Sequence, residues 1–169
     1  MTMTSPSEGK TSFEFLRAMD DKYNDNALLR LEMRKKYIVE ANLPDIVGKR
    51  VLDLASHDGR WPLTFAYAGA ASVVGVEARA HLVEAFGRCP DPVVKAKVQL
   101  HHSDLFDFLE AQVAAGERYD TVAVLGIFYH IMDHYRLLKL VKRLKPNLII
   151  VDSEFLDANW PYIRLGAEN

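Results

Sequence analysis

The sequence predicts an α/β protein with a doubly wound, mostly parallel sheet, and two patterns support this. Residues 122–125 (VAVL) and 148–151 (LIIV) are nearly continuous apolar runs rich in β-branched residues. Parallel strands covered by helices on both faces need such runs, because neither face meets water. Segments long enough for helices separate the strand-like runs, and this alternation predicts a three-layer sheet with right-handed crossovers.

The segment from Arg50 to Trp61, RVLDLASHDGRW, is the one around which the rest is organised. It predicts a strand, a tight turn and the start of a helix, which is how open α/β sheets build nucleotide sites. Asp53 lies inside the apolar run, and an acid there is costly to bury unless it contacts a ligand or caps the turn. The alternative is an ordinary turn between strand and helix with an Asp cap.

The remaining elements follow from periodicity and from turn residues. Residues 12–41 lack Pro and Gly and repeat apolar residues at helical spacing, which predicts two helices broken near Asn24, Asp25 and Asn26. Lys95 and Lys97 place the third strand at or near an exposed edge. Strands are expected at residues 50–54, 72–76, 94–101, 119–125 and 147–151, and later helices at 60–68, 80–88, 105–115 and 131–144.

Composition sets the class of protein. A chain of 169 residues predicts one domain, and a net charge of −2 gives no sign of a large basic surface for nucleic acid. One cysteine, Cys89, excludes an intramolecular disulfide and a cysteine-based metal site. The N-terminus lacks a secretory signal pattern, and no run of about 18 apolar residues predicts a membrane span. We therefore expect a soluble cytoplasmic protein that does not contact membranes.

Acidic residues follow the first three strands, at the edge of the sheet where ligands bind. Glu77 lies 24 residues beyond Asp53, close to the interval of about 20 residues at which an acid meets a ribose diol. Asp104 follows the third strand. Glu77 alone is more typical of a surface acid, but its register with the turn and with Asp104 favours a ligand.

Four segments resemble the successive motifs of the class I S-adenosylmethionine-dependent methyltransferases. They are RVLDLASHDGRW, VVGVEAR, HHSDLFDF and YDTVAVLGIFYHI, in the family's order and spacing, and they cover most of the chain from Val51 to Asp152. One departure is that Ala55 and His57 stand where the family usually has glycine, so that only Gly59 remains. His57 therefore needs a backbone with positive φ, which histidine tolerates better than most residues.

The resemblance implies S-adenosylmethionine as cofactor and S-adenosylhomocysteine as product. Asp53 and Gly126 are expected at the methionine end, Glu77 on the ribose hydroxyls, and Asp104 on the adenine amino group, with a Leu105 backbone N–H on the ring. The cofactor-binding residues implied in this way are Asp53, Ala55, Ser56, His57, Gly59, Glu77, Ala78, Arg79, Ser103, Asp104, Leu105, Leu125, Gly126 and Ile127. A nicotinamide cofactor is disfavoured because the first turn lacks Gly-x-Gly-x-x-Gly.

Tyr129, His130 and His134 lie just past the fourth strand, where the substrate is expected, and are the candidates for a catalytic base. The alternative is that His130 caps or packs against the next helix and that His134 is solvated. A metal site is not expected, because the two histidines have no specified third ligand.

The expected organisation is an N-terminal helical lid, residues 1–48, and a cofactor-binding core, residues 49–169, in a single domain. The core is expected without the family's usual C-terminal strand pair, so either the chain is a truncated form or a partner or a homodimer covers the exposed sheet edge. The expected function is methyl transfer to an oxygen or nitrogen of a small molecule. The alternatives are a methyltransferase for RNA, favoured only by the basic run Lys139, Lys142, Arg143 and Lys145, or for protein, and an inactive cofactor-binding partner protein.

Overall fold

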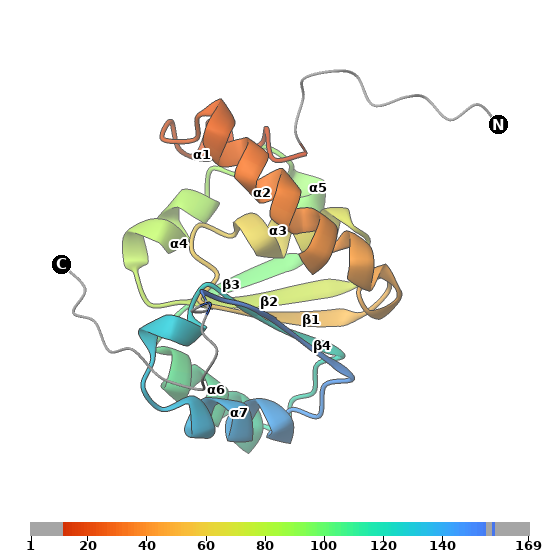
Figure 1. The fold of residues 1–169 in the computed structure, drawn as a ribbon, viewed down its shortest axis with the longest axis vertical. Coiled ribbons are helices and arrows are strands. Elements are labelled where there is room, and N and C mark those ends of the chain that lie inside the picture. The colour runs from red at the N-terminus through yellow and green to blue at the C-terminus, as the bar shows by residue number, and fades with distance from the viewer. Residues whose placement is uncertain (1–11, 155–156, 158–169) are drawn as a thin grey trace.

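The computed structural model describes residues 12–154 and residue 157. The chain forms three layers, with a sheet between two sets of helices (Figure 1). The expectations for residues 1–11, and for the missing strand pair after Phe155, lie outside the described residues.

The sheet has five strands in the order β3-β2-β1-β4-β5, and every neighbouring pair is parallel. This confirms the doubly wound architecture predicted from the apolar runs. β3 is an edge strand, as predicted, although the two lysines on which that prediction rested, Lys95 and Lys97, precede the strand. The strands are β1 (Arg50–Leu54), β2 (Ser72–Glu77), β3 (Val98–His102), β4 (Thr121–Leu125) and β5 (Leu148–Asp152).

One face of the sheet is covered by the N-terminal helices and by those that follow β1 and β2 (Figure 1). The break predicted near Asn24 is confirmed, because its side chain caps α2 by accepting from Ala27 N at 3.0 Å. These elements are α1 (Leu16–Met19), α2 (Asp25–Ile38), η1 (Glu40–Asp45), α3 (Arg60–Tyr67), α4 (Ala80–Phe86) and α5 (Pro92–Lys95).

The opposite face is covered by α6 (Leu105–Ala114) and α7 (His134–Arg143), with the short helix η2 (Phe128–His130) between β4 and α7. Alternation along the strands separates the two cores. Val51 packs under α2 and α3, whereas Leu52 and Leu54 pack against α6 and α7.

Two predicted boundaries differ from the structure by three residues or more. The third strand starts at Val98 rather than residue 94, because the Asp91 side chain caps α5 by accepting from Val93 N and Val94 N, both at 3.0 Å. The last helix starts at His134 rather than residue 131, because the Asp133 carboxylate accepts from Arg136 N at 2.9 Å and fixes the start there.

The strand order reverses between β1 and β4. Polar side chains placed after neighbouring strands therefore meet at one point, which is where ligands bind in open sheets. Within the described residues, every helix is too short or too polar to cross a bilayer.

Candidate functional site

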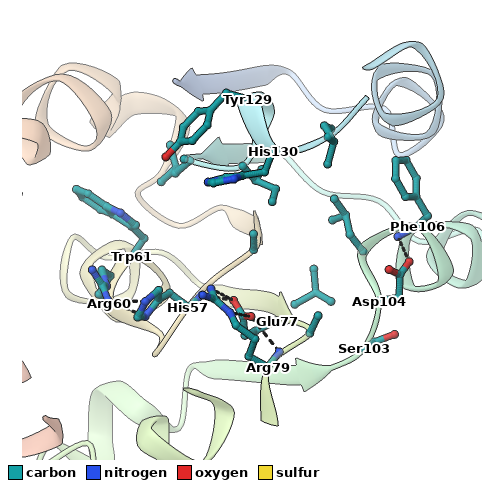
Figure 2. A pocket seen from close by; sticks show the side chains of 18 of the residues that line it. His57, Arg60, Trp61, Glu77, Arg79, Ser103, Asp104, Phe106, Tyr129 and His130 are labelled. Atoms are coloured by element: carbon teal, nitrogen blue, oxygen red, sulfur yellow. Dashed lines mark hydrogen bonds and ion pairs between the residues drawn. The ribbon is translucent and has the colours of Figure 1, made fainter. Parts of the chain in front are cut away.

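A cavity of about 600 Å³ opens at the carboxyl ends of the strands, within the size range of small-molecule sites. Its walls come from the segments after β1, β2, β3 and β4, with α2 closing one side (Figure 2). Most predicted site residues line it, namely Ala55, His57, Glu77, Ala78, Arg79, Ser103, Asp104, Leu105, Leu125, Gly126, Ile127, Tyr129 and His130.

Four predicted residues do not line the cavity. Ser56 and Gly59 lie inside the turn after β1, where Ser56 Oγ donates to the Asp53 carbonyl oxygen at 2.9 Å. Asp53 is buried beneath the turn. His134 lies behind η2, where its ring stacks on Phe128 with centroids 4.3 Å apart.

The turn after β1 has an unusual backbone. Ala55, His57 and Gly59 have φ of 58°, 55° and 84°, so the predicted positive φ of His57 is confirmed. This conformation turns the amide of His57 toward β2, where it donates to Glu77 Oε2 at 2.9 Å. A Cβ at Gly59 would lie 2.6 Å from Phe86 Cδ2, so packing against α4 also requires glycine there.

Glu77 ends β2 with its side chain only 3% exposed, on the wall of the cavity. Arg79 Nε donates to Glu77 Oε1 at 2.7 Å, and the Arg79 amide donates to the same oxygen at 3.0 Å (Figure 2). Burial opposes ionisation, but these hydrogen bonds outweigh it and hold the pKa of Glu77 below its usual value. The cavity therefore has an ionised carboxylate on this side.

Asp58 is a functional candidate that the sequence reasoning missed. It is fully buried, accepts from Arg60 Nε at 2.8 Å, and is hydrogen-bonded by the Tyr23 hydroxyl. Burial is outweighed by the contacts with His57 and Arg60, so the pKa of Asp58 is lowered. Arg60 also reaches His57 Nδ1 at 2.6 Å and thereby joins the buried acid to the cavity wall.

Asp53 differs from its neighbours. It is 1% exposed, and neither carboxylate oxygen has a hydrogen-bond partner among the described residues. Burial raises the pKa of Asp53 to about 8, and the negative charge of Glu77 adds to this. A buried acid with no partner among the described residues, beneath a turn that lines the cavity, fits a cationic ligand, because a positive charge nearby would stabilise its charged form.

Asp104 lines the far side of the cavity and also caps α6 (Figure 2). Its Oδ1 accepts from Phe106 N at 2.8 Å and from Asp107 N at 3.2 Å. The carboxylate is thus held in place by a helix N-terminus, a position that favours negative charge.

Tyr129 and His130 lie across the cavity from His57 and Glu77 (Figure 2). His134 supports them indirectly, because its Nε2 lies 2.7 Å from the carbonyl oxygen of Phe128 in the same short helix. Four hydrophobic residues of the wall were not predicted, namely Trp61, Val76, Phe106 and Ile131.

Arg34 is the second important residue that was missed. It extends from α2 into the cavity wall, forms an ion pair with Asp152 at the end of β5, and lies 5.1 Å from the centre of the Trp61 ring. Helical spacing places Arg34 on the same face as buried Leu31 and Ile38, but no local pattern indicates the cavity or the Asp152 partner.

No family model and no curated protein matches the sequence. Many solved structures do match. A putative S-adenosylmethionine-dependent methyltransferase from Streptococcus mutans is 19% identical with a TM-score of 0.56, covering 70% of this chain and 34% of that one. EvdMO1 is 26% identical with a TM-score of 0.54, covering 66% and 26%, and its N-terminal domain has been solved with S-adenosylhomocysteine bound.

A putative RNA methyltransferase from Pyrococcus horikoshii is 19% identical with a TM-score of 0.58, covering 71% of this chain and 59% of that one. The chain spans about a third or less of the first structures that it matches. It has the fold of the class I S-adenosylmethionine-dependent methyltransferases, as the sequence motifs indicated.

Proposed function

We propose that this chain binds S-adenosylmethionine in the cavity and is the cofactor-binding core of a methyltransferase. The observation that carries this is that three acids lie at one end of a parallel sheet, Glu77 and Asp104 on the cavity wall and Asp53 buried beneath the turn after β1. The buried, unpartnered oxygens of Asp53 support a cationic ligand over a neutral one.

Each acid has its own part of the cofactor to hold. Glu77 accepts from the ribose hydroxyls, with Ala78 and Arg79 beside the adenine. Asp104 accepts from the adenine amino group, and Leu105 faces the ring with its backbone N–H. Asp53 stabilises the amino-acid end, and Leu125 and Gly126 lie along it.

The cofactor, when bound, supplies an activated methyl group on a sulfonium sulfur. The chain contributes mainly alignment and exclusion of water. Trp61, Ile127 and Ile131 supply apolar wall for the acceptor. Tyr129 and His130 are the candidates to take a proton from a hydroxyl acceptor. We assign His134 a positioning role, since it holds η2 through Phe128.

The N-terminal segment, residues 1–48, is proposed as a lid on the core formed by residues 49–169. Arg34 supports this, because it spans from α2 to Asp152 at the end of β5 and lines the cavity on the way. A homodimer, or a partner chain, is proposed to cover the β5 edge, where Ile149 and Val151 are 38% and 42% exposed.

The acceptor is proposed to be a small molecule, methylated at oxygen or nitrogen. An RNA acceptor is the second candidate, and one observation favours it. Lys139, Lys142 and Arg143 lie exposed along α7, next to exposed Lys145. Binding of RNA through these residues would weaken steeply with added salt, whereas turnover of a small acceptor would not.

The test is calorimetric titration of the purified chain with S-adenosylhomocysteine, followed by transfer assays with labelled methyl groups. We expect one site per chain and release of S-adenosylhomocysteine from at least one acceptor in a panel of small phenols, amines and RNA. Binding without turnover of any acceptor would favour the inactive partner protein. Failure to bind the nucleoside at millimolar concentration would refute the proposal.

A further inference from the structure

Three acids lie around the carboxyl ends of β1 and β2, and two of them have an arginine partner. Asp58 pairs with Arg60 at 2.8 Å, and Glu77 pairs with Arg79 at 2.7 Å. Asp53 has neither an ion pair nor a hydrogen bond to its carboxylate among the residues that the structure describes. It is nevertheless 1% exposed. The site therefore contains one acid that the protein buries and leaves without compensation.

The groups that face Asp53 do not supply the missing partner. The Ser56 hydroxyl from the turn donates to the Asp53 backbone oxygen, and its proximity lowers the pKa of the carboxyl group by less than burial raises it. Arg60 on α3 and Arg34 on α2 act only at a distance, and each already holds another acid, Asp58 and Asp152. Glu77 on β2 is itself negative and opposes a second negative charge.

Burying an unpaired carboxylate costs several kcal/mol, so the neutral acid is the favoured form at this position. The electrostatics agree, since burial raises the pKa of Asp53 to about 8. At neutral pH the carboxyl group therefore retains its proton in the ligand-free protein.

We propose that Asp53 is a neutral carboxylic acid in the empty site and that binding a ligand's ammonium group expels its proton to solvent. The inference rests on the proposed function, because the ammonium is that of the cofactor's amino-acid end. The Asp53 O–H bond breaks, the proton passes to water and buffer, and the ammonium keeps its own three protons. Because Asp53 lies beneath the turn and not on the cavity wall, the resulting carboxylate is stabilised by the positive charge of the ammonium without direct contact.

Linkage then determines how binding depends on pH. Below the pKa of Asp53, binding must remove one proton, so affinity rises about tenfold for each pH unit. Above pH 8 the acid is already ionised and this dependence disappears. A group with the reference pKa of free histidine, near 6.5, would lose its pH dependence about one and a half units lower.

The experiment titrates S-adenosylhomocysteine into the protein at several pH values, in phosphate and in Tris, whose ionisation enthalpies differ. At pH 7 we expect about one proton released per ligand bound, with half of this effect lost near pH 8. Asp53→Asn should still bind and release none. Glu110→Gln is the matched control, because Glu110 is exposed on α6, where it pairs with Arg136 at 2.6 Å. It should release protons as the wild type does.

Infrared difference spectra of the wild-type protein give a second readout that needs no variant. Ligand binding should remove the band of a buried protonated carboxyl group and add a carboxylate band. Binding without proton release, or release that persists in a folded Asp53→Asn protein, would overturn the inference and leave the proposed function intact. No binding by equilibrium dialysis would refute the proposed function and this inference with it.

Discussion

Tyr23 donates its hydroxyl hydrogen to the buried carboxylate of Asp58, joining the N-terminal helices to the turn after β1. Tyr23 is 4% exposed and lies between α1 and α2, 35 residues away in the chain. Arg60 completes the contact, with its guanidinium 5.1 Å from the centre of the Tyr23 ring. The same turn carries His57 on the cavity wall, so the N-terminal segment supports the site from behind.

Tyr23→Phe should destabilise the fold. The change leaves a buried, charged acceptor short of one hydrogen bond, which costs about 1–3 kcal/mol. Urea unfolding measures the loss directly. Tyr37→Phe is the control, because Tyr37 is 79% exposed and its hydroxyl lies in solvent. Equal urea midpoints of unfolding for the two variants would show that the hydrogen bond from Tyr23 to Asp58 does not stabilise the fold.

Ala55→Gly should stabilise the protein. Ala55 has φ 58°, a conformation that costs a residue with a Cβ about 1–2 kcal/mol, and glycine avoids this cost at some loss of chain entropy. A net gain of about 0.5–1 kcal/mol in the free energy of unfolding is expected.

The control for this substitution is Ala96→Gly, at an exposed residue with φ −62°. There glycine should cost about 0.5–1 kcal/mol, because alanine is unstrained. If both substitutions lower the free energy of unfolding, the positive φ of Ala55 does not strain the folded chain.

The sequence predicted the sheet and the acids at its end because both depend on local patterns. Buried parallel strands need continuous apolar runs, and Glu77 follows directly from one. The turn conformation could also be anticipated, since His57 stands where a glycine is usual and the structure gives it positive φ.

Contacts between distant segments could not be predicted in this way. Tyr23 and Asp58, or Arg34 and Asp152, meet only because α2 packs across the sheet, and neither pair has a signal in local spacing. Asp53 lacks an ion pair among the described residues because the nearby arginines, Arg60 and Arg79, pair with Asp58 and Glu77 instead. The short helix α5 was not predicted, because Val93 and Val94 favour a strand. In the structure the Asp91 cap outweighs that preference and starts a helix.

Glu77→Gln should weaken binding of S-adenosylhomocysteine. Hydrogen bonds from ribose hydroxyls to a charged acceptor are worth about 1.5–3 kcal/mol, which corresponds to about 10- to 150-fold in affinity. Glu84→Gln makes the same change of charge at an exposed position of α4 and should leave affinity unchanged. Calorimetry compares the two, with thermal unfolding to check that both are folded. Unchanged affinity in Glu77→Gln would remove Glu77 from the ligand site.

Asp53→Asn should stabilise the ligand-free protein at high pH and have little effect at low pH. Below about pH 4 the acid is protonated in both the folded and unfolded chain, so it does not favour either. Between about pH 4 and 8 the unfolded chain loses this proton while the folded chain retains it, because the folded pKa is about 8. Wild-type stability therefore falls as pH rises through this range, by at most about 1.4 kcal/mol per unit.

Asparagine has a similar shape and does not titrate, so the difference in unfolding free energy between Asp53→Asn and wild type should grow with pH and level off above pH 8. The pKa of Asp58 is lowered in the folded chain, so ionised Asp58 stabilises the fold, and this contribution is lost as pH falls below about 4. It is the same in both proteins and therefore cancels from the difference. Urea unfolding at pH 4.5, 6 and 8 follows the difference, which should exceed about 1 kcal/mol at pH 8. Parallel stability curves would mean that Asp53 is ionised in the folded chain, because only a neutral buried acid makes the two proteins diverge.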